Sequence, residues 1–257
     1  MSSLAADGYE ILDMASSARK AINLARSMLK ETMGELCYYH TSVTDDQNEI
    51  QAAAGDRVRH VARVIVECHL TYFQSLLGQD IHITARPFFR LSRPGVTTDN
   101  IGFHRDTWYG DSPYELNVWI PLTDVDEGNG LWVAPGSHVW SDEDHPYETY
   151  ERPDVEKGSL KHSLGFLYAP KRLKTPVEMI PLPMKVGQML VFSLGLLHGQ
   201  EVNRSKYTRM SLDARLVNSY APILWERSRA KNYYEPLCSS VVSQIAKKYE
   251  AAKCLER

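Results

Sequence analysis

Apolar residues recur at helical spacing in the first third of the chain. One such run covers residues 16–34 and a second covers 56–77, with apolar residues three or four positions apart. An aspartate that can serve as an N-cap opens the second run, and a glycine closes each. The pattern predicts two helices that pack against a sheet, joined by an exposed polar loop over residues 41–51.

After Gly78 the helical period gives way to alternation of apolar and polar residues, which is typical of strands. Strands are expected at 81–91, 114–122, 130–134, 177–182, 188–194 and 207–217. Many short strands separated by turn residues predict an all-β sandwich or barrel. The polar stretch 138–174 is long for a loop in a compact domain, which favours a functional role such as a lid. A C-terminal helix is expected over 236–252.

Length and composition indicate one globular domain over residues 1–257, with a helical part (1–78), a β core (79–218) and a C-terminal extension (219–257). The net charge of −3 gives no reason to expect nucleic acid or a membrane surface as a partner. Four widely spaced cysteines without a C-x-x-C pattern indicate free thiols in a reducing compartment. Neither a signal peptide nor an apolar run of ~18 residues is found. We therefore expect a cytoplasmic protein.

An imidazole and a carboxylate stand two positions apart at His104 and Asp106. Residues i and i+2 of an extended chain share a face, so both can reach one metal ion. Such a pair alone is weak evidence, but a histidine, His198, ends an apolar run far downstream, and Arg209 follows it. Two histidines and one carboxylate form the facial triad of non-heme Fe(II) oxygenases. The arginine supplies a fixed cation for the far carboxylate of an oxo-acid cosubstrate.

The last predicted strand has a polar face that includes Arg209, Ser211, Asp213 and Arg215. On an edge strand such a face is simply solvated. The alternative hypothesis is that it lines the interior of a barrel, where a charge persists only if it is paired. The available partners are Asp213 and an anionic cosubstrate. The side chains of two further arginines, Arg86 and Arg90, are expected to point into the same cavity.

These motifs resemble the phytanoyl-CoA dioxygenase-type group of Fe(II)/2-oxoglutarate oxygenases, whose fold is a double-stranded β-helix (jelly roll). The matching stretches are 103–106, the strand 117–122, the Gly- and Pro-containing turn 128–138, His198-Gly199 and 209–211. Their order and spacing agree over roughly residues 80–218. The resemblance implies a mainly β jelly-roll core with packing helices before it and a helix after it.

The resemblance also implies the cofactors Fe(II), 2-oxoglutarate and O2. Iron is then bound by His104, Asp106 and His198, and Arg209 holds the distal carboxylate of 2-oxoglutarate. Asn117 and Trp119 are expected beside the cosubstrate. A branch of the wider superfamily that halogenates has Ala or Gly at the carboxylate position, so Asp106 makes halogenation unexpected.

The expected reaction is hydroxylation of an unactivated C–H bond in a small polar or amphiphilic metabolite. Desaturation, cyclisation and epimerisation would use the same residues. A non-catalytic metal- or ligand-binding jelly roll stays open as another class. A zinc hydrolase also stays open, although the H-E-x-x-H pattern is missing from the sequence. The loops 41–55 and 138–174, with Trp108 and Tyr109, are expected to select the substrate.

Two arginines on one strand compete for the cosubstrate. Arg209 and Arg215 are six positions apart, which is ~20 Å along a strand at ~3.3 Å per residue. We expect the start of the strand to lie nearest to the iron, so that Arg209 holds the cosubstrate. Arg215 is then expected to pair with Asp213 or with another acidic group further along the barrel.

Overall fold

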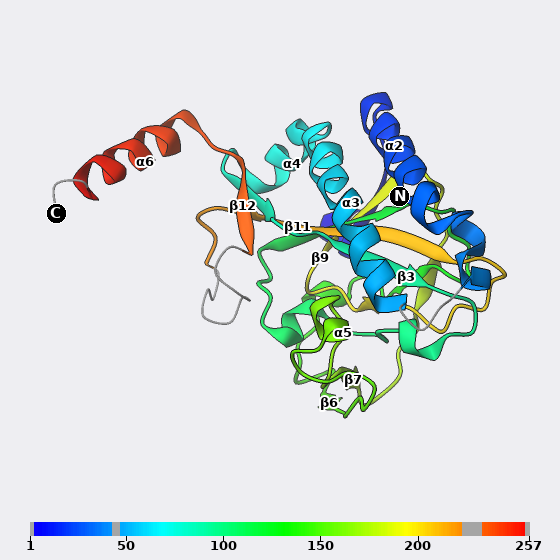
Figure 1. Ribbon diagram of the computed structural model, residues 1–257. Helices are drawn as coiled ribbons and strands as arrows, with labels where there is room; N and C mark the ends of the chain where they lie inside the picture. The colour runs from blue at the N-terminus through cyan, green and yellow to red at the C-terminus, as the bar shows by residue number, and fades with distance from the viewer. Residues whose placement is uncertain (1–2, 43–46, 223–232, 255–257) are drawn as a thin grey trace.

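The computed structural model describes residues 3–42, 47–222 and 233–254 (Figure 1). A large antiparallel sheet has the strand order β1-β9-β4-β11-β2-β12, and β3 also pairs with β11. Its strands are β1 (Tyr9–Asp13), β2 (Ile81–Thr84), β3 (Phe88–Ser92), β4 (Glu115–Pro121), β9 (Gln188–Ser193), β11 (Arg209–Asn218) and β12 (Tyr234–Cys238). A second sheet contains β10 (His198–Gly199), β5 (Leu131–Val133) and β8 (Ile180–Leu182), and a small hairpin contains β6 (Tyr147–Thr149) and β7 (Lys171–Leu173).

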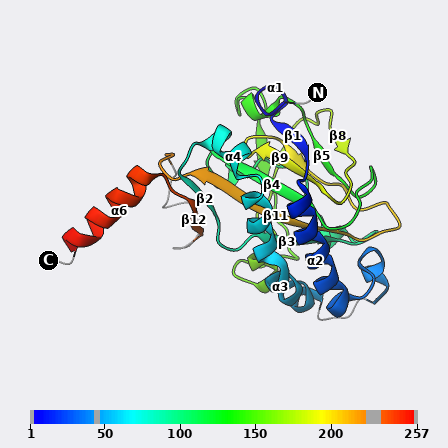
Figure 2. The same cartoon turned by 90° about the horizontal axis from the view of Figure 1, so that it is seen from above.

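The longer N-terminal helices lie together on one side of the large sheet (Figures 1 and 2). They are α2 (Ser16–Met33), α3 (Gln47–Glu67) and α4 (Leu70–Leu77). The shorter elements are α1 (Leu4–Asp7), α5 (Leu160–Ser163) and the 3-10 turns η1 (Leu36–Ser42), η2 (Thr97–Asp99), η3 (Asp106–Tyr109) and η4 (Ser137–Val139). The C-terminal helix α6 (Val241–Cys254) extends away from the sheets in both views.

Alternation along the central strands places two separate cores on the two faces of the large sheet. Met210, Leu212 and Leu216 of β11 are buried in the core that contains the apolar faces of α2 and α3. On the opposite face, Trp119 and Phe192 join Val133 and Leu182 of the second sheet in another core. Two antiparallel sheets therefore face each other, and the predicted mainly β class with helices at both ends is confirmed. A pair of facing antiparallel sheets is the arrangement that a jelly roll requires.

The helical region differs from the prediction at two points. The expected loop 41–51 is shorter, because α3 already begins at Gln47; residues 43–46 lie outside the described part. Asp56 is therefore not a cap but lies inside α3, where it forms ion pairs with Arg59 and Arg86. The second predicted helix is also divided between α3 and α4, and His69 at the division accepts a hydrogen bond from the Ala15 N–H through its Nε2 (3.0 Å).

Several strand boundaries also differ from the prediction. The alternating run 81–91 forms two strands, β2 and β3, separated at residues 85–87. Pro87 lies in this break and has no N–H to donate to a strand ladder. β1 was not expected, and it pairs with β9 at one edge of the large sheet. Pro236, the expected start of the C-terminal helix, instead lies in β12, which forms the opposite edge beside β2.

None of the helices in the described ranges is long and apolar enough to cross a membrane. Three of the four cysteines, Cys37, Cys68 and Cys238, are free thiols as predicted. The side chain of the fourth, Cys254, lies outside the described part of the structure.

The first prediction concerns the core between β11 and the helices. Leu212 is fully buried there, whereas Leu24 on α2 is 58% exposed. Leu212→Ala should lower the free energy of unfolding by about 2–5 kcal/mol, because the truncated side chain leaves a cavity. Leu24→Ala should change it by less than about 0.5 kcal/mol. Urea denaturation of both variants measures the difference, and equal losses would contradict the placement of this core.

Candidate metal and cosubstrate site

His104 and His198 are held side by side by their own backbones. The His104 N–H donates to the His198 carbonyl (2.8 Å), and the His198 N–H donates to the His104 carbonyl (2.9 Å). Gly199 is needed for this approach, because a Cβ there would lie 2.3 Å from the Gly102 carbonyl oxygen. Reciprocal bonds between segments far apart in the sequence thus fix the spacing of the two imidazoles.

Asp106 brings a carboxylate to the same point from the start of η3. Its Oδ1 lies 3.7 Å from His104 Nε2, and its Oδ2 lies 3.9 Å from His198 Nε2. All three residues are buried. These separations are shorter than two metal–ligand bonds of ~2.1 Å placed end to end. One metal ion placed between the three side chains can therefore contact all of them.

The hydrogen bonds of the two imidazoles engage Nδ1 and leave the Nε2 lone pair for a metal. His104 Nδ1 lies 3.0 Å from the Gly102 carbonyl oxygen, and His198 Nδ1 lies 2.9 Å from the Leu196 carbonyl oxygen. A carbonyl only accepts, so each Nδ1 carries the hydrogen and each Nε2 keeps its lone pair. Burial lowers the pKa of His198 to about 4, so this ring is neutral near pH 7. The sequence could not identify these anchors.

Asp106 is in contact with a buried arginine. The Arg215 Nη2 donates to Asp106 Oδ1 (2.8 Å), while Arg215 Nη1 lies 2.7 Å from Asp111 Oδ2. Burial alone raises the pKa of Asp106, but the Arg215 guanidinium and the two histidines outweigh it and hold the pKa well below its usual range. The other Asp106 oxygen, Oδ2, is buried and has no hydrogen-bond partner among the residues that the structure describes. A buried anionic oxygen without a partner fits a divalent cation.

Arg209 provides the cationic end of the same pocket. Its side chain is buried, and its guanidinium lies 5.4 Å from the centre of the Trp119 ring. Within the described part of the chain, its Nε and Nη1 atoms have no hydrogen-bond partner. Burial lowers the pKa of Arg209 to about 10, which still leaves it charged at neutral pH. A buried cation with unused donors is costly unless an anion binds to it, which makes Arg209 a candidate receptor for a carboxylate.

The polar face of β11 does line the interior. Arg209, Asp213 and Arg215 border one pocket with His104 and His198. Ser211 is buried on this face, and no described residue forms a hydrogen bond with its hydroxyl. The expectation that the start of β11 lies nearest to the candidate ligands is wrong, because Arg215 contacts Asp106 directly. Arg215 does pair with acidic groups, as expected, but these are Asp106 and Asp111.

Of four other residues that the sequence predicted for the pocket, two line it and two do not. Trp119 and Arg90 line the pocket, and Arg90 also donates to the Leu164 carbonyl (3.0 Å). Asn117 is buried in β4 opposite Arg215 in the strand register and does not line the pocket. The prediction for Arg86 is wrong, since its side chain is 73% exposed and pairs with Asp56 at the surface. The interruption of the strand at Pro87 accounts for this error.

The family model for phytanoyl-CoA dioxygenase matches residues 14–211. The chain belongs to the phytanoyl-CoA dioxygenase family. Members of this family are oxygenases that use Fe(II), 2-oxoglutarate and dioxygen, and these are the cofactors that the sequence predicted. The triad His104, Asp106 and His198 meets the requirement of that family for two histidines and one carboxylate.

Individual relatives match over smaller shares. Phytanoyl-CoA dioxygenase 1 of Oryza sativa subsp. japonica is 27% identical over 49% of this chain and 42% of its own length. The streptomycin biosynthesis protein StrG of Streptomyces griseus is 35% identical over 27% of this chain and 36% of its own length. The chain thus spans less than half of either relative.

Solved structures show the same fold. The apo form of the non-heme monooxygenase ThoJ aligns with a TM-score of 0.57 at 16% identity, covering 92% of this chain and 82% of ThoJ. The nickel complex of ThoJ aligns over the same shares with a TM-score of 0.52 at 15% identity. At this identity the likeness shows the phytanoyl-CoA dioxygenase-type fold and no more.

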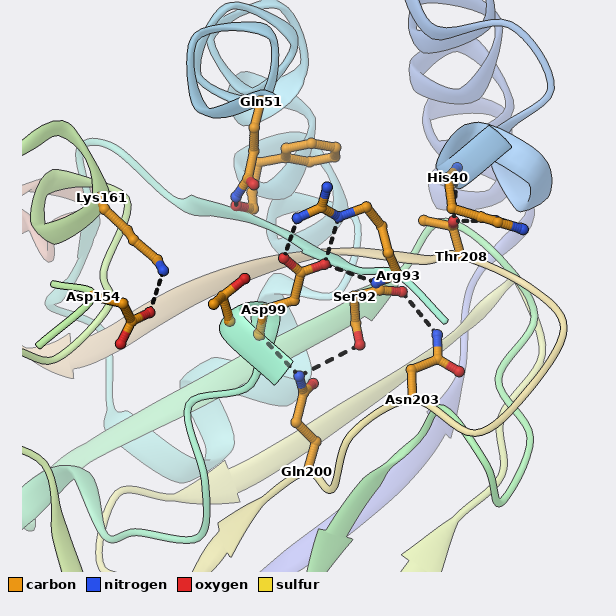
Figure 3. Close-up of polar contacts among 12 residues, drawn as sticks. His40, Gln51, Ser92, Arg93, Asp99, Asp154, Lys161, Gln200, Asn203 and Thr208 are labelled. Carbon is orange, nitrogen blue, oxygen red and sulfur yellow. Dashed lines mark hydrogen bonds and ion pairs between the residues drawn. The ribbon is translucent and has the colours of Figure 1, made fainter. Parts of the chain in front are cut away.

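The rim of the pocket contains residues that the sequence analysis did not identify. Asp99 and Gln200 line the pocket, and Arg93 pairs with Asp99 at 2.6 Å (Figure 3). The Gln200 amide donates to the Asp99 carbonyl (3.2 Å), which fastens η2 to the segment that follows β10. No periodic pattern marks these residues, because they lie in turns outside the strands.

The segment 138–174, which the sequence predicted as a loop, covers one side of the site and contains the hairpin β6–β7 and the short helix α5. Phe166 lines the pocket, and Arg152 donates to the Asn100 and Thr98 carbonyls on the rim. Trp108 and Tyr109 border a separate cavity with Tyr168 and Lys171 of this loop. The Tyr109 ring approaches the His104 ring edge-on at 5.9 Å between centroids. The expected mouth residues therefore lie beside the pocket, next to one candidate ligand.

The second prediction tests the pairing of the two histidine segments. In Gly199→Ala the added Cβ meets the Gly102 backbone, which cannot move aside as a flexible side chain can. We expect a loss of about 1–3 kcal/mol in the free energy of unfolding together with weaker Co(II) binding. Gly34→Ala is the control: nothing lies within 4 Å of its added carbon, although its φ of +70° also makes the substitution unfavourable. Weaker Co(II) binding in both variants would contradict a specific role for Gly199.

Proposed function

We propose that this protein is an Fe(II)/2-oxoglutarate-dependent dioxygenase in which His104, Asp106 and His198 bind the iron. The observation that carries the proposal is the presence of two complementary features in one pocket. One is a buried triad in which Asp106 Oδ2 has no hydrogen-bond partner within the described ranges, and the other is a buried Arg209 whose Nε and Nη1 also have none there. A metal ion satisfies the first and the distal carboxylate of 2-oxoglutarate satisfies the second.

Different residues of the pocket bind the metal, orient the cosubstrate and exclude water. Three facial ligands leave open positions for a keto acid and dioxygen. Bound iron supplies oxidising chemistry that converts 2-oxoglutarate and O2 to succinate and CO2 and places one oxygen atom in a C–H bond. Arg209 orients the cosubstrate, and the Trp119 ring beneath it restricts where the carboxylate lies. The covering loop and Phe166 limit the access of water.

The proposed substrate is a small polar or amphiphilic metabolite that is hydroxylated. The pocket lining is consistent with such a molecule, because it contains polar side chains, Arg90, Gln200 and Asp213. It also contains two apolar side chains, Ile101 and Phe166. Desaturation, cyclisation or epimerisation would use the same iron and cosubstrate residues. A metabolite screen for stimulated 2-oxoglutarate consumption tests the substrate class. A clear preference for long fatty acyl thioesters would overturn it.

The third prediction concerns the anionic ligand. Asp106→Ala removes the carboxylate and should abolish both Fe(II)-dependent turnover and stoichiometric Co(II) binding. Calorimetric titration with Co(II) and an assay of succinate formation measure the two effects. Full activity of this variant with iron would show that Asp106 is not a ligand.

The fourth prediction concerns the cosubstrate. Arg209→Lys keeps the charge but loses the planar fork that binds a carboxylate through two parallel hydrogen bonds. Loss of charge-assisted hydrogen bonding corresponds to a roughly ten- to hundredfold higher 2-oxoglutarate requirement. Co(II) binding should survive. The matched control is Arg86→Lys, which changes a surface arginine and should leave the requirement unaltered. Equal effects of the two substitutions would refute the assignment of Arg209.

A further inference from the structure

The Arg215 guanidinium lies between two buried carboxylates. It donates to Asp106 Oδ1 at 2.8 Å and contacts Asp111 Oδ2 at 2.7 Å. The three side chains are only 4%, 8% and 4% exposed for Arg215, Asp106 and Asp111. Removing three charged groups from water carries a large cost, which their mutual attraction must offset. Because such buried ion pairs add little net stability, a functional role is the better explanation for this arrangement.

The contact with Asp106 divides the roles of its two oxygens. Arg215 occupies Oδ1, while Oδ2 is buried and has no hydrogen-bond partner in residues 3–42, 47–222 and 233–254. The carboxylate therefore cannot rotate freely, and one oxygen stays available. A carboxylate that bound the metal through both oxygens would occupy one more coordination position. In the proposed reaction that position is needed by the keto acid or dioxygen.

Arg215 is itself held by a rigid support. It lies in β11 between the neighbouring strands β2 and β4, and its N–H donates to Thr84 Oγ1 (3.1 Å). Asp111 holds the other end of the guanidinium. These contacts from two strands and Asp111 fix the position of Arg215 within the fold.

We propose that Arg215 is a positioning residue that binds Asp106 Oδ1 and leaves only Oδ2 for the metal, with Asp111 fixing the opposite end of its guanidinium. This inference rests on the proposed function, because it requires Asp106 to be a metal ligand. Lysine is no substitute here, since one ammonium group lacks the fixed fork that spans two carboxylates.

A second buried ion pair provides a matched control. Arg93 and Asp99 lie 2.6 Å apart and are 12% and 9% exposed, so they are comparably buried. Arg93 contacts none of the three candidate ligands in the described structure; its partner is Asp99 at the rim (Figure 3). Arg93→Lys therefore disturbs a buried ion pair without touching Asp106.

The experiment compares the full chain with Arg215→Lys, Asp111→Asn and Arg93→Lys. Co(II) affinity is measured by calorimetry, Co(II) coordination by its visible absorption spectrum, and the stability of the metal-free proteins by thermal unfolding. We expect Arg215→Lys and Asp111→Asn to weaken Co(II) binding about 10- to 100-fold, as loss of groups that orient metal ligands does. Their Co(II) spectra should also change. Arg93→Lys should lower stability but leave the affinity within about twofold and the spectrum unaltered.

The outcomes separate this inference from the proposed function. If the unaltered chain binds no Co(II), the metal assignment fails and the positioning role fails with it. If the unaltered chain binds Co(II) but Arg215→Lys and Asp111→Asn bind it equally well, the positioning role alone is wrong. Equal weakening in Arg93→Lys would likewise overturn it. Should Arg215→Lys fail to fold, Asp111→Asn decides, because it keeps the arginine and removes only the charge that holds it.

Discussion

The candidate site depends on the reciprocal hydrogen bonds between the backbones of His104 and His198. They join two segments that approach the site from different parts of the chain, and they work only because Gly199 lets the Gly102 carbonyl come close. Each imidazole is then anchored to a carbonyl two residues before it. Backbone geometry alone thus fixes the position, spacing and tautomer of two metal-binding groups, and the carboxylate needs separate control.

We propose that two arginines on the inner face of β11 have these two roles: one controls the carboxylate and the other receives the cosubstrate. The charge of Arg215 is paired within the protein, with Asp106 and Asp111. Arg209 lies over Trp119 with unused donors and keeps its charge for a ligand. Burial is costly for both guanidinium groups, so the difference lies in their partners. In the proposed site, the arginine that the fold pairs orients a metal ligand, and the arginine with unused donors binds the anionic cosubstrate.

The sequence predicted what depends on local periodicity. Alternation in β11 predicted that its polar side chains share one face, and the spacing of His104 and Asp106 predicted that both reach one point. The structure brings these two side chains together, although Asp106 begins the turn η3 and is not in an extended segment. The contact between Arg215 and Asp106 joins residues 109 positions apart, and no local pattern encodes it. The error at Arg86 arose because the alternating pattern continues through a break that Pro87 imposes on the strand. Turn residues such as Asp99 and Gln200 carry no periodic signal at all.

In the proposed site, one pocket binds iron and 2-oxoglutarate together. Anaerobic titration of the protein with Fe(II) and then 2-oxoglutarate, followed by visible absorption, tests it most directly. A keto acid that chelates protein-bound Fe(II) gives a charge-transfer band, and we predict that this band saturates at one iron and one 2-oxoglutarate per chain. Failure of the band to form when both are present in excess would contradict the account.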